Sequence, residues 1–341
     1  MRFARLSFAA LAASLALAAA PAAMADQTAD FKKGLAAYDA GDFRGAANIF
    51  TSIIQANPKE WAAWVDRGNA YYALKEWDKA ASDYKQALSI KADYDTWVSL
   101  GNTLDNDGDY PAAVNAYRAA IAMDGRKASA WIELGVAQAG QKNLTEALKS
   151  YENAARLEPK NGRAQRQLGD AYYGLERFQD AIAPFEKAEK LLPDDIIPPR
   201  RLGDIYQELK QNELSAAAYD RALAIDANDF QALMNKGNLY YNEGDYGTAL
   251  ALYRRGVKAD SSNAWAQSYL GDAYYNTGAF SQARLAYDAA LAIDSQHADA
   301  LKGGARVRLQ LGDKAGARAM IERLRKIDAK AADALGKELF P

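Results

Sequence analysis

The sequence predicts an all-α fold in which about nine similar units stack into a solenoid. A short motif of Gly, Asn or Asp, any residue, Tyr and Tyr occurs four times, in "GNAYYALKEW", "GDAYYGLERF", "GNLYYNEGDY" and "GDAYYNTGAF". The glycines of these stretches, Gly68, Gly169, Gly237 and Gly271, lie 101, 68 and 34 residues apart, close to multiples of 34. The composition, 50% hydrophobic and 25% charged over 341 residues, is typical of a folded soluble protein.

The first 25 residues differ from the rest of the chain. Arg2 and Arg5 precede the apolar run "LSFAALAASLALAAA", and Ala23 and Ala25 form an A-x-A pattern. These are the marks of a secretory signal peptide, so we expect residues 1–25 to be removed and the mature protein to lie in a bacterial periplasm. An uncleaved membrane anchor is the alternative, and the A-x-A pattern favours cleavage. No later segment is apolar enough to span a bilayer, so we expect no transmembrane span after cleavage.

The 34-residue period divides residues 26–331 into consecutive units, one of which is shortened to 33 residues. A closing helix is expected at residues 332–341. The first and ninth units match the pattern poorly, as expected for the ends of a stack, which must present a polar outer face. The predicted units begin at residues 27, 61, 94, 128, 162, 196, 230, 264 and 298.

The repeated residues resemble those of the tetratricopeptide repeat proteins, here of a secreted bacterial type. Their signature is W-x2-L-G-x2-Y, then A-x3-F, then P. The second unit matches it with Trp64, Gly68, Tyr71, Ala80 and Tyr84, and the fifth with Leu168, Gly169, Tyr172, Ala181, Phe185 and Pro193. The resemblance implies a right-handed superhelix of helix-turn-helix units. It also implies that the first helix of each unit lines a concave groove in which partners bind.

The physical roles of the repeated residues can be read from their types. Gly169 and Ala181 let the two helices of a unit approach closely, and Phe185 fills the space beside them. Pro193 lacks an amide donor and ends the second helix. Pro184 falls inside an expected second helix, where we expect it to produce a kink.

Only the first tyrosine of each pair occupies the packing position of the signature. The second lies about 100° further round the first helix and shares a face with the residue three positions earlier. Tyrosine beside asparagine can hold an extended backbone without fixing its sequence. Simple copying of repeat residues is the alternative reading. The predicted groove residues are Asn69, Tyr72, Asn102, Arg166, Asp170, Tyr173, Arg200, Asp204, Asn238, Tyr241, Asp272 and Tyr275.

Two of these residues allow two readings. Arg166 and Arg200 could receive a ligand carboxylate or a sugar hydroxyl, or each could pair with the aspartate four residues later in its own helix. Some co-chaperones of the family hold a partner's terminal carboxylate with a clamp of lysine, asparagine and arginine. This chain carries Val65, Val98 and Met234 four residues before three of its asparagines, which argues against that clamp.

The composition excludes several classes of function. There is no cysteine and a single histidine, His297, which excludes thiol catalysis, disulfides and two-histidine metal sites. Motifs for phosphate binding or nucleophilic catalysis are also missing from the sequence, so we expect no enzyme activity, no cofactor and no metal. The balance of 42 basic and 44 acidic residues argues against a nucleic-acid partner.

The sequence therefore predicts a non-catalytic interaction scaffold of the bacterial cell envelope, with a protein or peptide partner in its groove. The alternative is a carbohydrate-binding accessory to exopolysaccharide export or envelope assembly, with a polysaccharide as its ligand. Tyrosines beside carboxylates and arginines fit that second reading as well. Repeat grooves and exposed terminal helices can also mediate self-association.

Overall fold

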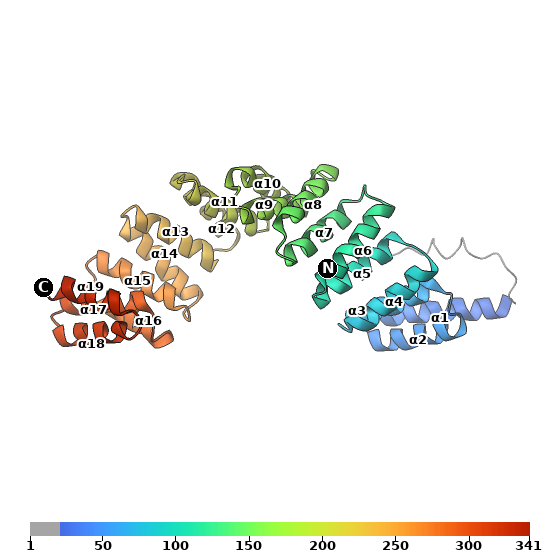
Figure 1. Ribbon diagram of the computed structural model, residues 1–341, viewed down its shortest axis with the longest axis horizontal. Coiled ribbons are helices and arrows are strands. Elements are labelled where there is room, and N and C mark those ends of the chain that lie inside the picture. The colour runs from blue at the N-terminus through green and yellow to red at the C-terminus, as the bar shows by residue number, and fades with distance from the viewer. Residues whose placement is uncertain (1–20) are drawn as a thin grey trace. The chain divides into compact units, whose positions relative to one another are not determined.

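The computed structural model describes residues 21–341, and within that range every regular element is a helix (Figure 1). The prediction of an all-α fold is confirmed. The chain divides into two compact units, the first ending at Leu157 and the second beginning at Glu158. Most of the predicted signal peptide lies outside the described residues, and the predicted cleavage site after Ala25 lies within the first described helix.

The first unit contains four helix pairs. Its helices are α1 (Pro21–Asp39), α2 (Phe43–Ala56), α3 (Trp61–Ala73), α4 (Trp77–Ile90), α5 (Tyr94–Asp107), α6 (Tyr110–Met123), α7 (Ala128–Gly140) and α8 (Leu144–Leu157). Each pair is joined by a turn of a few residues, as the 34-residue period requires. We call the odd-numbered member of each pair the first helix and the even-numbered member the second helix.

The second unit contains five helix pairs and one further helix. Its helices are α9 (Gly162–Gly174), α10 (Phe178–Leu191), α11 (Ile197–Glu208), α12 (Asn212–Ile225), α13 (Phe230–Asn242), α14 (Tyr246–Ala259), α15 (Ala264–Asn276), α16 (Phe280–Ile293), α17 (Ala298–Gln310), α18 (Lys314–Arg325) and α19 (Ala329–Leu339). The last of these covers residues 329–339, against the predicted 332–341. Helix α11 begins one residue after the predicted start of its unit.

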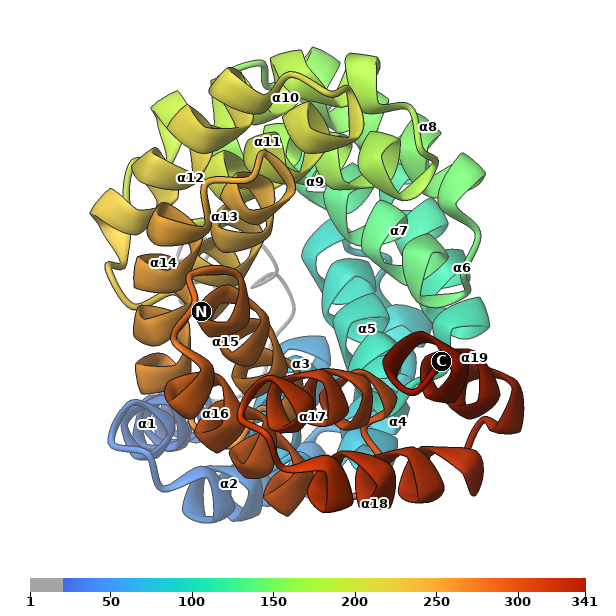
Figure 2. The same ribbon diagram turned by 90° about the vertical axis from the view of Figure 1, so that its left-hand side faces the viewer.

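First and second helices form separate layers within each unit. Figure 2 shows α13, α15 and α17 on one side of the second unit and α14, α16 and α18 on the other. Each helix packs against its pair partner and, within its unit, against the helix that follows in the chain. Neighbouring first helices also touch, as α5 does α7 in the first unit and α15 does α17 in the second. A side chain on the exposed side of a first helix therefore lies close to those of the adjacent repeats.

The turn inside each pair contains one left-handed residue, and in several pairs a side chain also caps the second helix. Between α13 and α14, Gly244 has φ of +84°, and Asp245 accepts a hydrogen bond from the amide of Thr248 at 3.0 Å. Between α7 and α8 the left-handed residue is Lys142, with φ of +61°. A non-glycine residue pays about 1–2 kcal/mol for this conformation, so packing of the flanking helices must impose it.

In eight of the nine described helix pairs, a glycine of the first helix lies against an aromatic ring of the second helix. A methyl group built on Gly203 would lie 2.4 Å from the ring of Tyr219, and one built on Gly169 would lie 2.9 Å from that of Phe185. Both rings are fully buried. No side chain larger than hydrogen fits between the helices at this position, which explains why the motif begins with glycine. Six other first helices with such a glycine are α1, α3, α5, α7, α13 and α15.

Pro184 lies inside α10 and does not end it. The helix runs without interruption from Phe178 to Leu191, and the proline is buried. Because proline has no amide hydrogen, it cannot donate to the carbonyl of Asp180 one turn earlier. Packing of α10 against its neighbours therefore outweighs the cost of the missing bond.

Replacement of Gly203 by alanine should destabilise the protein by about 1–3 kcal/mol, because the new methyl group would collide with Tyr219. The urea midpoint of helical circular dichroism measures the change. Gly336→Ala in α19 is the matched control, since nothing lies within 4 Å of its added methyl group. It should leave stability unchanged or raise it by up to about 1 kcal/mol. Equal effects of the two substitutions would contradict the packing constraint.

Candidate functional site

All twelve predicted groove residues lie on first helices, and each is half-buried. In the first unit, Asn69 and Tyr72 lie on α3 and Asn102 on α5. The second unit carries the other nine. We call the positions of these twelve residues, together with the exposed side of the same helices, the first-helix face of each unit. The second-unit residues are Arg166, Asp170 and Tyr173 on α9, Arg200 and Asp204 on α11, Asn238 and Tyr241 on α13, and Asp272 and Tyr275 on α15.

Five asparagines and aspartates of this face accept a hydrogen bond from a buried tyrosine of the second helix. The oxygen Oδ1 of Asn69 accepts from the hydroxyl of Tyr84 at 2.7 Å. Tyr84 is 1% exposed, so its hydroxyl needs a protein acceptor. The equivalent bonds are Tyr117 to Asn102 (2.8 Å), Tyr219 to Asp204 (2.8 Å), Tyr253 to Asn238 (2.7 Å) and Tyr287 to Asp272 (2.6 Å).

Sequence reasoning missed this structural role, although the sequence carries a signal for it. The acceptor stands fifteen residues before each tyrosine. Where the second helix carries Phe50, the acceptor position is Leu35, because a phenylalanine ring needs no acceptor. Asp170 is an exception, since its second helix carries Phe185. Its carboxylate instead lies 3.6 Å from Nε of Arg201.

The tyrosine bond leaves the amide nitrogen of two asparagines available. Because Oδ1 of Asn102 and of Asn238 accepts from a tyrosine hydroxyl, Nδ2 of each points elsewhere. Among residues 21–341 neither nitrogen has a hydrogen-bond partner, and neither is buried. Asn69 differs, since its Nδ2 donates to Asp66 at 3.2 Å. Each unit thus presents one oriented amide donor, Asn102 in the first unit and Asn238 in the second. A backbone carbonyl of a bound segment could accept a hydrogen bond from it.

The second tyrosines are held by rings and by amides. The ring of Tyr72 meets Trp77 edge-on at 5.1 Å, and that of Tyr241 meets Tyr246 in the same way at 5.1 Å. The hydroxyl of Tyr241 accepts a hydrogen bond from Asn276 in the next repeat at 2.8 Å. The hydroxyl of Tyr72 likewise accepts from Asn106, at 2.9 Å. Tyr173 and Tyr275 meet Phe178 and Phe280 edge-on, at 5.6 and 5.4 Å.

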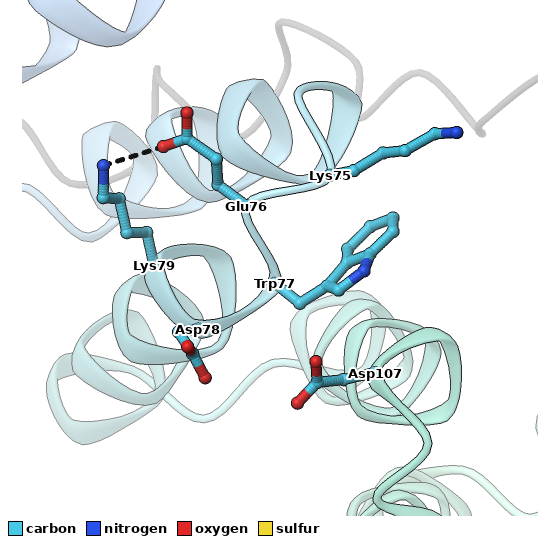
Figure 3. Close-up of a pocket in the computed structure, with 6 residues that line it drawn as sticks. All are labelled: Lys75, Glu76, Trp77, Asp78, Lys79 and Asp107. Atoms are coloured by element: carbon cyan, nitrogen blue, oxygen red, sulfur yellow. Dashed lines mark hydrogen bonds and ion pairs between the residues drawn. The ribbon is translucent and has the colours of Figure 1, made fainter.

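A hollow of about 320 Å³ lies at the turns of the first unit (Figure 3). Figure 3 shows the side chain of Trp77 above Asp107, with Lys79 bonded to Glu76 at 2.8 Å. Five of its six lining residues belong to the turn and the first residues of α4. The hollow is therefore a feature of the hairpin ends. It is lined by Lys75, Glu76, Trp77, Asp78, Lys79 and Asp107.

The two arginines of the face do not form the expected intrahelical pairs, so that reading was wrong. Arg166 pairs with Asp195 at 2.8 Å, and Arg200 with Asp229 at 3.0 Å. Both aspartates precede the first helix of the next repeat, and Asp229 also caps α13. Each arginine can reach its aspartate because the two repeats are stacked. Pairing within the helix would leave the negative charges of Asp195 and Asp229 without these arginine partners. Both arginines thus tie one repeat to the next.

The family model described as "Tetratricopeptide repeat" matches most of the chain. The matched residues are 31–95, 98–156, 144–196, 200–264, 234–298 and 269–334. The chain belongs to the tetratricopeptide repeat family. The helix pairs are therefore tetratricopeptide repeats in tandem, and the predicted α-solenoid is confirmed. Proteins of this family act as protein-interaction scaffolds and bind protein or peptide partners.

Similar proteins come from plants, fungi and bacteria. Hsp70-Hsp90 organizing protein 2 of Arabidopsis thaliana is 37% identical over 62 residues, which are 18% of this chain and 11% of the relative. Small glutamine-rich tetratricopeptide repeat-containing protein 2 of Mycosarcoma maydis is 30% identical over 93 residues, 27% of this chain and 26% of the relative. The chain thus spans about a quarter or less of these curated relatives. The C-terminal part of a TPR repeat-containing protein from Cytophaga hutchinsonii shares the fold, with a TM-score of 0.62, 20% identity and coverage of 70% of this chain and 99% of that one.

The tetratricopeptide repeats of this chain lack the lysine of the co-chaperone clamp. Four residues before Asn69 and Asn238 stand Val65 and Met234, which are 3% and 5% exposed. A buried apolar side chain cannot donate to a carboxylate. Positions 65 and 234 therefore cannot supply the cation of that clamp.

Two carboxylates of the first unit stand in an unfavourable environment that the sequence did not reveal. Burial raises the pKa of Asp66 to about 7, against the opposing hydrogen bond from Asn69. Burial also raises the pKa of Asp105, and the negative charge of Glu133 adds to the effect. One oxygen of Asp105 is buried without a hydrogen-bond partner. Both groups lower the stability of the folded chain when they are ionised.

Two features are absent from the described part of the chain, a metal-binding group and a membrane-spanning helix. Among residues 21–341, no group of three or more histidine, cysteine, aspartate or glutamate side chains is placed to hold a metal ion. In the same range no helix has the length and apolar character needed to cross a membrane.

Asn238→Leu should destabilise the protein by about 1–3 kcal/mol, because the hydroxyl of buried Tyr253 would lose its acceptor. The double variant with Tyr253→Phe should recover most of that loss, since it reproduces the pairing of Leu35 with Phe50 in the first repeat. Urea unfolding of the two single variants and the double variant measures the coupling. If the stability losses of the two single variants simply add in the double variant, the hydrogen bond between Tyr253 and Asn238 does not explain the asparagine at this position.

Asp66→Asn should stabilise the protein near neutral and alkaline pH and have little effect near pH 4. A carboxyl with a raised pKa binds more protons in the folded state, so its contribution to stability is lost as pH rises from about 4 through about 7. The difference in thermal midpoint between the variant and the parent should grow over that range. Asp107→Asn, at an exposed position, is the control. A difference that shrinks with rising pH would contradict the burial of Asp66.

Proposed function

We propose that this chain is a non-catalytic scaffold of the bacterial cell envelope that holds an extended peptide or protein segment on its first-helix faces. The family supplies the general role, since its members act as protein-interaction scaffolds. The specific ligand class rests on the chemistry of the faces. An extended segment presents backbone carbonyls and amides at regular intervals, and these match polar side chains repeated along a helical stack.

The observation that carries the proposal is the orientation of Asn102 and Asn238. A tyrosine hydroxyl occupies Oδ1 of each asparagine, so the amide nitrogen remains as a fixed donor toward solvent. A fixed donor loses little side-chain entropy when it binds a carbonyl. Tyr241 and Tyr275, edge-packed on neighbouring rings, add rigid apolar surface with a polar tip. Donors and rings of this kind bind a backbone without selecting a particular sequence.

The cell-envelope setting rests on the N-terminal sequence. Arg2 and Arg5, the apolar run after them and the A-x-A pattern ending at Ala25 support export through a cleavable signal peptide. We therefore place the mature chain, from Asp26 onward, in the periplasm. N-terminal sequencing of the protein recovered from a periplasmic fraction would identify the first residue.

Photo-crosslinking in living cells tests the function. A photoreactive amino acid replaces Tyr241 or Tyr275 on the face, and the adducts are identified by mass spectrometry. The matched control replaces Leu285, which is 62% exposed on the second helix α16. We expect a discrete protein adduct from both face positions and none from the control.

The other outcomes have clear meanings. The same adducts from all three positions would contradict a specific face. Adducts with glycan and no protein would overturn the peptide ligand in favour of a carbohydrate-binding accessory to export. A protein adduct from Leu285 alone would move the binding surface to the second helices.

A further inference from the structure

Helix α15 carries two aromatic residues that the repeat pattern does not call for. Trp265 and Tyr269 stand one turn apart on its first-helix face, and Trp265 is 54% exposed. Copying of a consensus cannot explain them, because the equivalent residues of the other first helices are mostly small, polar or charged. For Trp265 these are Thr28, Ala62, Asp95, Ser129, Arg163, Ile197, Gln231 and Asp299, and for Tyr269 they are Lys32, Asp66, Ser99, Glu133, Gln167, Arg201, Asn235 and Gly303.

The two rings belong to a rigid aromatic series. The ring of His297 meets Trp265 edge-on at 4.3 Å, and Trp265 lies 6.2 Å from Tyr269. Tyr269 stacks on Tyr253 at 5.8 Å with 29° between the planes. His297 is 3% exposed and accepts from the amide of Ala300 at 3.3 Å, so it caps α17 from a fixed position. Trp265 is thus held in place at one edge while most of the ring faces solvent.

Two carboxylates flank these rings. Asp272 lies on the same face of α15, one turn beyond Tyr269, and Asp299 comes from the first turn of α17. Burial raises the pKa of Tyr269, and the negative charges of Asp299 and Asp272 add to the rise. Asp272 accepts from the hydroxyl of Tyr287 at 2.6 Å and forms no ion pair with any residue between 21 and 341.

Asp272 forms no ion pair with any cation among residues 21–341. Burial raises the pKa of Asp272 to about 6, the bond from Tyr287 opposes the rise, and the negative charge of Asp299 adds to it. The charge of Arg306 also lowers this pKa, but its guanidinium is hydrogen-bonded to Glu338 at 3.0 and 3.1 Å. A half-buried carboxylate without a cation is costly, and a bound cation would remove that cost.

A second polar group beneath the rings also lacks a partner. Ser268 lies on α15 between Trp265 and Asp272 and is 1% exposed. Its hydroxyl has no hydrogen-bond partner in the described structure. Asp299 has a cation of its own, Lys302 at 3.1 Å, but that pair is largely exposed and therefore weak. The surface combines an exposed indole, a neighbouring phenol ring and excess negative charge.

We propose that Trp265, Tyr269, Asp272 and Asp299 form a cation-recognition surface, on which a lysine or arginine side chain of the bound segment lies over the indole with its charge toward the carboxylates. This inference rests on the proposed function and narrows the partner to a basic segment. Indole is the aromatic ring that attracts cations most strongly, and desolvation near a carboxylate increases the attraction. An acidic segment would meet like charge at the same place.

Fluorine NMR of the full chain labelled with 5-fluorotryptophan tests the inference. Trp265 is the sole tryptophan of residues 158–341, and the loss of one signal in Trp265→Leu assigns it. The probe is a short blocked peptide of alternating lysine and alanine, with glutamine and glutamate versions as controls. We expect saturable movement of the Trp265 signal with the lysine peptide and weaker movement, or none, with the other two.

Charge variants give the second readout. Asp272→Asn keeps an acceptor for Tyr287, because three other repeats carry asparagine at this position with the tyrosine bond intact. It should weaken lysine-peptide binding about threefold to thirtyfold. Glu213→Gln, which removes an exposed charge from the first turn of the second helix α12, should leave binding unchanged.

Failure of this inference can be told apart from failure of the proposed function. Equal movement with the lysine, glutamine and glutamate peptides would overturn cation recognition and leave a backbone-binding face. Stronger binding of the glutamate peptide would also overturn it. Failure of all three peptides to move the Trp265 signal would overturn the site itself, whatever protein adducts the crosslinks at Tyr241 and Tyr275 yield.

Discussion

The structure depends on one contact, that of a glycine in the first helix with an aromatic ring of the second helix, which every described pair except α17 and α18 makes. The ring of Tyr253 lies so close to Gly237 that an added methyl group would come within 2.5 Å of it. This contact sets the distance between the two helices and buries the ring. Burial of a tyrosine creates the next requirement, because its hydroxyl must be satisfied. The acceptor beside the glycine meets that requirement, so packing determines the residue type on the first-helix face.

The polar residues of the face serve the fold, and in our proposal they also serve the ligand. The oxygen of Asn238 holds Tyr253, and the nitrogen of the same amide has no partner among residues 21–341. Asp272 performs the same structural task with a carboxylate, which brings a negative charge where an amide would suffice. Since the hydroxyl bond needs only an acceptor, the charge at Asp272 is free to serve recognition. Its position on the same helix as Trp265 fits the proposed cationic partner.

The sequence predicted the fold well because its determinants are local and repeated. A glycine, an alanine and an aromatic residue at constant spacing indicate a helix pair whichever partner the chain binds. The site was predicted less completely. Asn238 lies on the first helix, as predicted, but its bond to Tyr253 joins two helices and cannot be read from one helical pattern. Trp265 was not predicted as a site residue because it occurs in a single repeat, whereas a repeated motif reveals only residues that recur.

The most direct test is an NMR titration of the side-chain amides of asparagine with the lysine–alanine peptide. If tyrosine hydroxyls hold the oxygens and leave the nitrogens for a bound backbone, the signals of Asn102 and Asn238 should move with increasing peptide. The signal of Asn48, exposed on the second helix α2, should remain fixed. Movement of Asn48 with Asn102 and Asn238 unchanged would contradict recognition on the first-helix faces.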